Sequence, residues 1–384
     1  MGFAFALAVI AGLSVSNLYY VQSLLPSIAQ QLSLSESTVL LAPMVIQIGL
    51  ASSLLLVLPI GDGLERRQLL VKAAFGTAIA LGLIAVLSDF RMLLVAWFTL
   101  GLFSLVPYLL PAYASGLVAD DIRGKTLGVI LSGQFSGILL SRSFSGVVGE
   151  QFGWRSVFVF SSLAMAMIAV WMKFRLPVEK KPASISYLSL QISQLRLLRT
   201  YPELRRACIS QSLQFGTFMG VWSALSLHLS ASPWRMGPAL IGTFGLVGIV
   251  SIAAAPTIGR LVDQVGGARV VIFSTFCSLF GVVLLALFAN SLIGIAFGLI
   301  LLDLGVQGSY VANQTRVFNL NPAARSRMAC LLFFGAYAGA ALSSAMVAYF
   351  WSGWGWKGVT VIGIVLVLLA LISQFRTNRH LAAH

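Results

Sequence analysis

LIGIAFGLILLDLGVQGSYVANQTRVF, residues 292 to 318, combines a long apolar run with a carboxylate, Asp303, near its middle. A helix of about 20 residues, rising about 1.5 Å per residue, crosses the hydrocarbon core of a bilayer, so this stretch is long enough to span it. A charged side chain at that depth costs on the order of 2.5–3.5 kcal/mol on insertion scales. We therefore expect Asp303 to have a function and the other segments to enclose it.

The composition of the whole chain agrees with a membrane location. Of its 384 residues 58% are hydrophobic and 9% are charged, with a mean hydropathy of +0.93, whereas soluble domains carry about 25% charged residues. The three cysteines, Cys208, Cys277 and Cys330, lie in apolar segments without ligand spacing, so neither a disulfide framework nor a metal site is expected. The first 20 residues lack a basic leader and are expected to form a retained first helix.

Charged or turn-rich breaks divide the chain into apolar segments of spanning length. Because a spanning segment must satisfy its own backbone hydrogen bonds, and these segments exceed a barrel strand in length, the sequence predicts an all-α protein with twelve transmembrane helices. The expected helices lie near 3–27, 38–60, 69–87, 92–118, 126–149, 155–174, 206–229, 238–259, 269–289, 292–317, 328–350 and 358–375.

The distribution of Lys and Arg predicts the orientation. Of these 25 residues, 20 fall in one set of alternate loops and termini, four in the other, and Arg142 lies inside a helix. By the positive-inside rule, both termini and the long polar linker are expected in the cytoplasm. The net charge of +14 is then an orientation signal, and a nucleic-acid partner is not expected.

A polar linker, residues 176–205, separates two six-helix bundles, residues 1–175 and 206–384. Its later part, LSLQISQLRLL, is amphipathic and is expected to lie on the membrane surface. The two halves repeat each other: Gly-Trp-Arg at 153–155 recurs as Gly-Trp-Lys at 355–357, Arg-Gly-Lys at 123–125 recurs as Arg-Ser-Arg at 325–327, and Asp62 recurs as Asp263. Parallel six-helix repeats are typical of major facilitator transporters.

With these repeats, the chain resembles the major facilitator superfamily over essentially its whole length. The loop after the eighth segment, Gly259-Arg-Leu-Val-Asp-Gln-Val-Gly-Gly-Ala-Arg269, is similar to the family's loop signature, and the loop at 58–67 is a degraded copy of it. The resemblance implies a cytoplasmic gate that latches one conformation. Its expected residues are Asp62, Arg66, Arg67, Asp263, Arg269, Asn313, Gln314 and Arg316.

The fifth segment resembles the glycine-rich helix of the family's antiporters, with Gly128, Gly133, Gly137, Gly146 and Gly149, although the usual Gly-Pro pair is absent. Within the family, residues 17–29, 137–146 and 301–327 are similar to bacterial multidrug and sugar-efflux permeases. Many proton-coupled members carry an arginine in the fourth helix, where this chain has Trp97.

Arg142 is the candidate to replace that arginine. It lies about 12 Å, and Asp303 about 16 Å, from the same membrane face by helical rise. Asp303 is the candidate proton carrier, because a carboxylate can bind and release a proton as its cavity opens to each side. A direct ion pair, a shared cavity, or separate local hydrogen bonds to hydroxyls such as Ser141, Ser143 and Ser145 all remain open.

Polar side chains in the apolar segments are the candidates for substrate binding. In the first segment, Asn17 and Tyr20 share one helix face and Tyr19 and Gln22 approximately share another. The family fold places the first, fourth, seventh and tenth helices around a central cavity, although an aromatic belt with interhelical hydrogen bonds is the structural alternative. The full candidate set is Asn17, Tyr19, Tyr20, Gln22, Gln134, Trp222 and Gln307.

No catalytic constellation is expected, because the sequence has no P-loop, nucleophile elbow or HExxH motif, and no cofactor is implied. The leading hypothesis is a monomeric secondary transporter of the bacterial inner membrane that exports a small molecule in exchange for protons. A proton-coupled uptake symporter is the first alternative, and a membrane-embedded ligand sensor or scaffold is the second.

Overall fold

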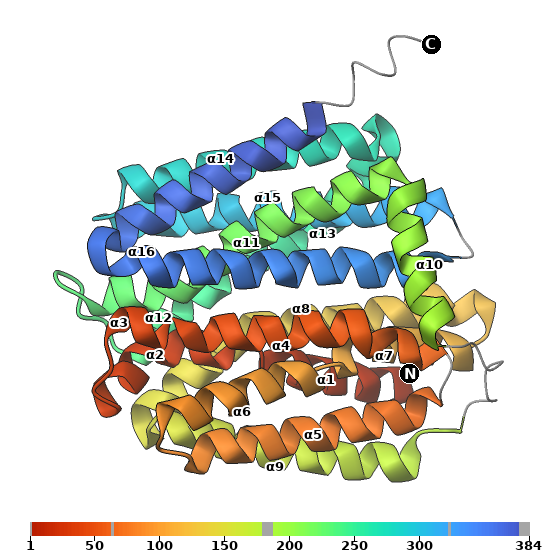
Figure 1. The fold of residues 1–384 in the computed structure, drawn as a ribbon, viewed down its shortest axis with the longest axis horizontal. Helices are drawn as coiled ribbons and strands as arrows, with labels where there is room; N and C mark the ends of the chain where they lie inside the picture. The colour runs from red at the N-terminus through yellow and green to blue at the C-terminus, as the bar shows by residue number, and fades with distance from the viewer. Residues whose placement is uncertain (1, 63–64, 179–186, 322–323, 376–384) are drawn as a thin grey trace. The chain divides into compact units, whose positions relative to one another are not determined.

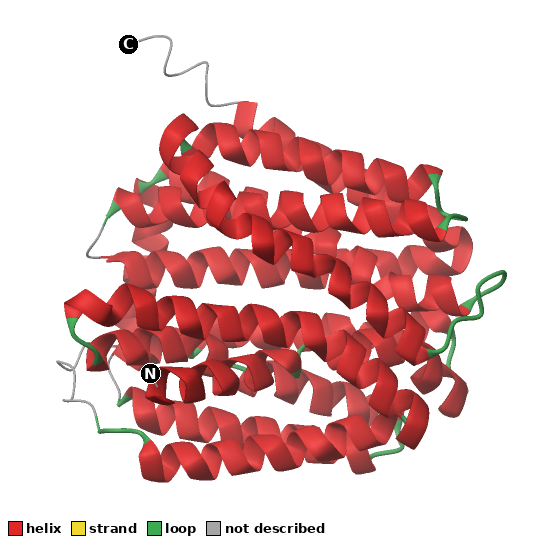
Figure 2. Cartoon of the chain, turned by 180° about the vertical axis from the view of Figure 1, so that it is seen from behind, coloured by secondary structure: helices red, strands yellow, loops and turns green. Residues whose placement is uncertain are grey.

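The computed structural model describes residues 2–62, 65–178, 187–321 and 324–375 (Figure 1). Helices make up this part of the chain and no strand occurs in it (Figure 2). Two short 3-10 helices, η1 (Leu58–Asp62) and η2 (Phe244–Gly248), accompany the α-helices. These are α1 (Gly2–Ser16), α2 (Tyr20–Gln31), α3 (Glu36–Val39), α4 (Leu41–Leu56), α5 (Arg66–Val86), α6 (Phe90–Phe103), α7 (Val106–Leu117), α8 (Asp120–Phe152), α9 (Trp154–Arg175), α10 (Tyr187–Thr200), α11 (Pro202–Ser230), α12 (Pro238–Thr243), α13 (Ile249–Val265), α14 (Gly267–Leu287), α15 (Leu292–Leu320) and α16 (Arg325–Phe375).

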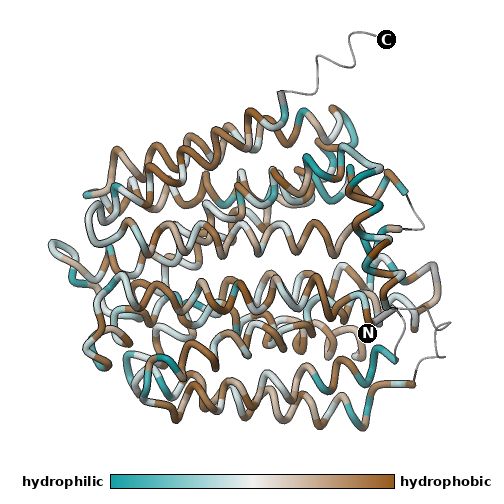
Figure 3. Tube along the Cα trace, viewed as in Figure 1, coloured by the Kyte–Doolittle hydropathy of each residue, from teal (hydrophilic) through white to brown (hydrophobic). Residues whose placement is uncertain are grey.

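Ten helical stretches in the described ranges are long and apolar enough to cross a membrane, by length and composition. The longest, Arg325–Gln374, holds two of the expected helices, because Gly355 adopts a non-helical conformation inside α16. α11 is also of spanning length, with 29 residues, but is more polar. Counting α16 twice and adding α11 accounts for all twelve expected helices, and apolar residues predominate along them (Figure 3).

Glycines at the repeated Gly-Trp sequences both adopt positive φ at a helix connection. Gly153 has φ +82° between α8 and α9, and Gly355 has φ +50° inside α16. Residues other than glycine rarely adopt this left-handed region. The tryptophan that follows each glycine is buried, with Trp154 2% and Trp356 7% exposed. The sequence repeat therefore corresponds to a repeated helix connection.

Four of the expected helices are interrupted in the described residues. The first breaks between α1 and α2 at Asn17–Tyr19, and the second at Leu40, between α3 and α4, and again before η1. The fourth breaks between α6 and α7 just before Pro107, and the eighth at η2. Proline at the start of α7 is suited to a helix N-terminus, because it has no backbone N–H to donate. The prediction of uninterrupted helices was wrong at these points, since hydropathy does not register a local break.

The described residues form two compact units, one of residues 1–35, 45–191 and 229–246, the other of residues 36–44, 192–228 and 247–384. In the first unit, α1 packs along α8 and α5 along α9. The approach of α1 to α8 is close: a Cβ atom on Gly137 would lie 2.2 Å from the Gly12 carbonyl oxygen. Only glycine permits this backbone contact, so Gly137 of the glycine-rich fifth helix allows α8 to pack closely on α1.

In the second unit, α14 packs along α15, and α16 also contacts α14. A buried apolar cluster joins the end of α10 to α11, α15 and α16; it consists of Leu197, Leu204, Ala207, Val317, Ala324, Met328, Leu331 and Leu332. The amphipathic linker segment is helical, as α10. Leu190 and Leu197 are buried, while Leu188, Ile192 and Leu195 are exposed, so α10 is apolar on two sides.

Candidate functional sites

The break in the first helix is stabilised by Asn17. At this break the Leu18 amide donates to the Val15 carbonyl and the Tyr19 amide to the Ser16 carbonyl. Each of these hydrogen bonds joins residues three apart, whereas those of an α-helix join residues four apart. The Asn17 Nδ2 group donates to the carbonyls of Leu13 and Ser14, at 3.2 Å each. Because an unpaired carbonyl is costly away from water, the amide compensates for part of the lost helical bonding. The break also sets where Tyr19, Tyr20 and Gln22 point.

Arg142 lies at a buried site in the first unit, with only 4% of its surface exposed. Its Nε atom donates a 2.9 Å hydrogen bond to Oε1 of Gln22, and its guanidinium lies 5.2 Å from the centre of the Tyr19 ring. An amide oxygen and an aromatic face both stabilise a guanidinium without neutralising it. Tyr19 and Gln22 therefore do share a face, as their spacing predicts, and that face meets Arg142.

The backbone of Arg142, in α8, contacts α12. Although α12 follows α11 in the chain, it belongs to the first compact unit, as α8 does. A Cβ atom on Gly242 would lie 2.4 Å from the Arg142 carbonyl oxygen, so the two backbones touch. The neighbouring Ser143 hydroxyl donates to the Gly242 carbonyl at 3.0 Å. Any displacement of α12 against α8 must therefore disturb the residue that carries the buried charge.

The hydroxyls near Arg142 bond to backbone carbonyls. Ser141 donates to the Ile138 carbonyl, Ser143 to Gly242, and Ser145 to the Arg142 carbonyl, with the Ser145 and Ser23 hydroxyls 2.7 Å apart. The serines of this segment thus stabilise the backbone around Arg142, while Gln22 accepts from its side chain.

Asp303 is the corresponding buried charge of the second unit, with 5% of its surface exposed. The indole Nε1 of Trp222 donates to its Oδ1 atom at 3.2 Å. Trp222 is itself buried, and its ring packs against Phe218 with centroids 6.2 Å apart. Gln307, one helical turn from Asp303, is partly buried on the same side of α15. Trp222, Asp303 and Gln307 thus lie near one another.

A buried hydroxyl and amide network lies farther along the same helices. The Gln214 Nε2 group donates to Ser309 at 2.6 Å and to Thr275 at 3.0 Å, while Ser278 donates to Gln214 Oε1 at 3.0 Å. Gln214 and Ser309 extend from α11 and α15, the helices of Trp222 and Asp303. This network fixes the register of the two helices that form the Asp303 site.

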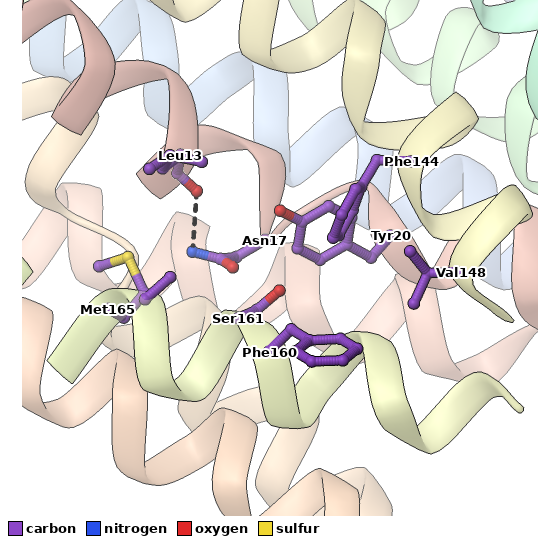
Figure 4. Close-up of a pocket in the computed structure, with 9 residues that line it drawn as sticks. Leu13, Asn17, Tyr20, Phe144, Val148, Phe160, Ser161 and Met165 are labelled. Carbon is purple, nitrogen blue, oxygen red and sulfur yellow. Dashed lines mark hydrogen bonds between the residues drawn. The ribbon is translucent and has the colours of Figure 1, made fainter. Parts of the chain in front are cut away.

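Asn17 and Tyr20, the other pair of the first segment, contribute to a different place. They line a pocket together with residues of α8 and α9, shown in Figure 4. The ring of Tyr20 packs against Phe144, with centroids 5.7 Å apart. The two pairs inferred from sequence therefore lie at two different places, although the helix is broken at Asn17–Tyr19, and only Tyr19 and Gln22 meet Arg142. Sequence reasoning missed the pocket partners Ser161, Phe144 and Phe160, because nothing in an apolar helix marks its rotation.

Gln134, also a substrate candidate, donates to the carbonyl of Pro107. This bond joins α8 to α7 at the break in the fourth helix.

The expected gate residues lie at several helix ends. Arg67 donates to the Lys173 carbonyl, Gln314 to the Tyr310 hydroxyl at 3.3 Å, and Arg316 to Gln374 Oε1 at 3.3 Å. Asn313 is fully buried, whereas Asp263 and Arg269 are exposed and Arg66 is half-buried. Asp62 lies in η1, and its side chain falls outside the described residues.

Comparison with known proteins agrees with this helical architecture. The family model for the Major Facilitator Superfamily matches residues 5–251. The chain is 31% identical over 370 residues to the uncharacterized transporter YgaY of Escherichia coli O157:H7, covering 96% of this chain and 94% of that protein. It is 26% identical over 381 residues to the inner membrane transport protein YnfM of Escherichia coli K12, covering 97% and 90% of the two chains.

Among solved structures, the chain is similar to the nucleoside transporter NupG, with a TM-score of 0.79, 14% sequence identity and coverage of 97% of this chain and 99% of that one. This likeness concerns the fold. The family match extends over more than half of the chain, and the relatives are named as transporters. The chain therefore belongs to the Major Facilitator Superfamily, and it is a multi-pass membrane transporter, not an enzyme.

Proposed function

We propose that this transporter exports a small molecule across the bacterial inner membrane in exchange for protons, by alternating access. The observation that carries the proposal is the setting of Asp303, a buried carboxylate that accepts a hydrogen bond from the uncharged indole of Trp222. The indole orients the carboxylate without neutralising it, so this contact does not compete with the proton as a cation would. Asp303 is accordingly the proposed proton carrier, and Trp222 and Gln307 are proposed to bind substrate beside it.

Arg142 is the proposed second element of coupling. Its guanidinium is held by Gln22 and Tyr19, and its backbone contacts α12. A rearrangement that moves α12 would change the environment of this charge and thereby link substrate binding to conformation. Gln22 and Tyr19 are proposed to meet substrate when it enters the site.

The moving parts are proposed to be the two sequence halves, residues 1–175 and 206–384, connected by the linker at 176–205. Both termini are proposed to lie in the cytoplasm, on the strength of the excess of Lys and Arg in the corresponding loops. On that side, Asp62, Arg66, Arg67, Asp263, Arg269, Asn313, Gln314 and Arg316 are proposed to form the gate.

The substrate is proposed to be neutral, amphipathic or cationic and not multiply anionic, since the candidate residues are mainly aromatic and amide side chains with few charges. Arg142 would favour an anionic group instead if its guanidinium reaches the cavity. The transporter is proposed to work as a monomer. The test uses inverted membrane vesicles with an imposed proton gradient and a panel of drugs, sugars and amphiphiles. Gradient collapse on addition of one compound, dependent on the transporter, supports exchange. Accumulation of a compound that moves together with protons would assign uptake instead, and saturable binding without flux would assign a sensor.

A further inference from the structure

A pocket of about 380 Å³ lies inside the first compact unit, between α1, α2, α8 and α9 (Figure 4). It lies within the size range of small-molecule sites in proteins. Its lining is Leu13, Asn17, Tyr20, Phe144, Val148, Phe160, Ser161, Ala164 and Met165. Aromatic and aliphatic side chains make up most of this surface, and none of the lining residues is charged.

The pocket has one polar region, which contains an unsatisfied acceptor. Asn17 is 1% exposed, and its Nδ2 group donates hydrogen bonds to the Leu13 and Ser14 carbonyls. Its Oδ1 atom has no hydrogen-bond partner among the described residues. This oxygen is itself buried, beside a pocket that Asn17 lines. Buried polar atoms are nearly always paired, so a hydrogen-bond donor that reaches this part of the pocket would satisfy it.

Two hydroxyls accompany this acceptor. Tyr20 and Ser161 both line the pocket, and both side chains are at least 95% buried. In Figure 4 the amide of Asn17 and the hydroxyls of Tyr20 and Ser161 are directed toward the same part of the pocket. A ligand group placed there could donate to Asn17 Oδ1 and lie beside both hydroxyls.

The outer part of the pocket is apolar and accessible. Leu13 is 41% exposed, Phe144 41% and Phe160 51%, and all three lie in helices of membrane-spanning character. In a bilayer, exposed apolar side chains at such positions contact lipid or the neighbouring helices. A molecule that dissolves in the bilayer could therefore enter beside Phe144 and Phe160 with its apolar part outward.

We propose that this pocket binds an uncharged amphiphile that carries one hydrogen-bond donor, such as a hydroxyl, directed at Asn17 Oδ1. The apolar body of the ligand packs against the paired rings of Tyr20 and Phe144 and against Phe160. The absence of charge among the lining residues selects against ionised molecules, because a buried ion needs a partner. This site differs from the Arg142 site, which uses the other face of the first helix, and it does not depend on the direction of transport or on proton coupling.

The test measures equilibrium binding of tritiated 4-octylphenol to the purified full-length protein. Its methyl ether, 4-octylanisole, has nearly the same shape but no donor and serves as the matched probe. The phenol is expected to bind the wild-type protein about 3- to 10-fold more tightly than the ether, the range for one neutral hydrogen bond. In Asn17→Leu this preference disappears, whereas the affinity of the ether changes little.

A second variant keeps the test valid if Asn17→Leu does not fold. Ala164→Phe places a large ring in the pocket and should abolish binding of both probes. Leu163→Phe, its matched control, adds a ring at an adjacent position that is 58% exposed and does not line the pocket, so binding should persist. Equal affinities of wild-type protein for phenol and ether, or equal binding by the two phenylalanine variants, would overturn the proposal.

The natural ligand could be a membrane lipid component or a transported solute of the same chemistry. Mass spectrometry of neutral lipids that copurify with wild-type protein, and not with Ala164→Phe, would assign a lipid. Loss of 4-octylphenol flux in Ala164→Phe proteoliposomes, with flux retained in Leu163→Phe, would assign a solute. Either result supports the site.

Discussion

The indole Nε1 of Trp222 donates a hydrogen bond to Oδ1 of Asp303 at 3.2 Å, and both side chains are buried. Trp222 lies in α11 and Asp303 in α15, two long helices of the same compact unit. A bond between a neutral donor and a buried carboxylate is stronger than one between two neutral groups, yet it does not cancel the negative charge. Trp222 therefore fixes the position of Asp303 and leaves its ionisation to the rest of the site.

Replacing Trp222 by Phe keeps an aromatic ring but removes the donor. A hydrogen bond to a charged group contributes about 1.5–3 kcal/mol, so the transport rate should fall roughly 10- to 100-fold if this bond holds Asp303 during the cycle. Transport by reconstituted protein checks the effect. The control is Trp351→Phe in the same unit, which removes the 2.7 Å bond from Trp351 to Glu36 and leaves Asp303 untouched. Equal losses in the two variants would contradict a specific role for Trp222.

The Arg142–Gln22 contact should show energetic coupling. Arg142→Lys removes the Nε donor, and Gln22→Leu removes the acceptor, so each single change breaks the same 2.9 Å bond. The double variant should transport little worse than the poorer single variant, with a coupling of about 1–3 kcal/mol. A double-mutant cycle on transport rates measures this quantity. Strictly additive effects would show that the two residues act separately.

Gly137 should tolerate no side chain. A Cβ atom there would lie 2.2 Å from the Gly12 carbonyl oxygen and 2.6 Å from the Gly12 Cα atom. Gly137→Ala is expected to destabilise the fold by about 1–3 kcal/mol through overpacking, visible as a lower melting temperature in detergent. Gly128→Ala on the same helix is the control, because a Cβ atom there meets nothing within 4 Å. That substitution should leave stability unchanged or raise it by up to about 1 kcal/mol.

The repeated glycines Gly153 and Gly355 should behave alike. Both have positive φ, +82° and +50°, and a Cβ atom added to either would meet nothing within 4 Å. Alanine at either site is therefore expected to destabilise through backbone strain alone, by about 1–2 kcal/mol. Gly353→Ala, two residues before Gly355, has the same free space without positive φ and serves as the control. Thermal unfolding of the three variants measures the difference. A loss at Gly153 without one at Gly355 would contradict the equivalence of the two turns.

Much of the fold could be predicted from the sequence. Apolar length and charged breaks are properties of single segments, so hydropathy located twelve helices, and the Gly-Trp repeat indicated two repeated halves. The breaks in the first, second, fourth and eighth helices were missed. They depend on local hydrogen bonding, such as that of Asn17 to Leu13 and Ser14, which leaves no mark in an average over many apolar residues.

Only part of the candidate site could be predicted from the sequence. Buried charges are rare enough in apolar segments that Arg142 and Asp303 were evident, and helical spacing separated Tyr19 and Gln22 from Asn17 and Tyr20. The partners across helices were not evident. Which residue faces Asp303 depends on how α11 and α15 are rotated, and that rotation results from packing of the whole unit, including the Gln214 network.

Proton exchange by Asp303 is tested most directly with Asp303→Asn in proteoliposomes, using the solute found in the vesicle panel. Asparagine keeps an acceptor for Trp222 but cannot carry the proton. We predict that solute binding stays within about threefold of wild type, while solute-driven proton movement and its pH dependence are lost. Asp89→Asn, which neutralises an exposed carboxylate yet retains the cap of α6, should transport like wild type. Full pH-dependent transport by Asp303→Asn would contradict the account.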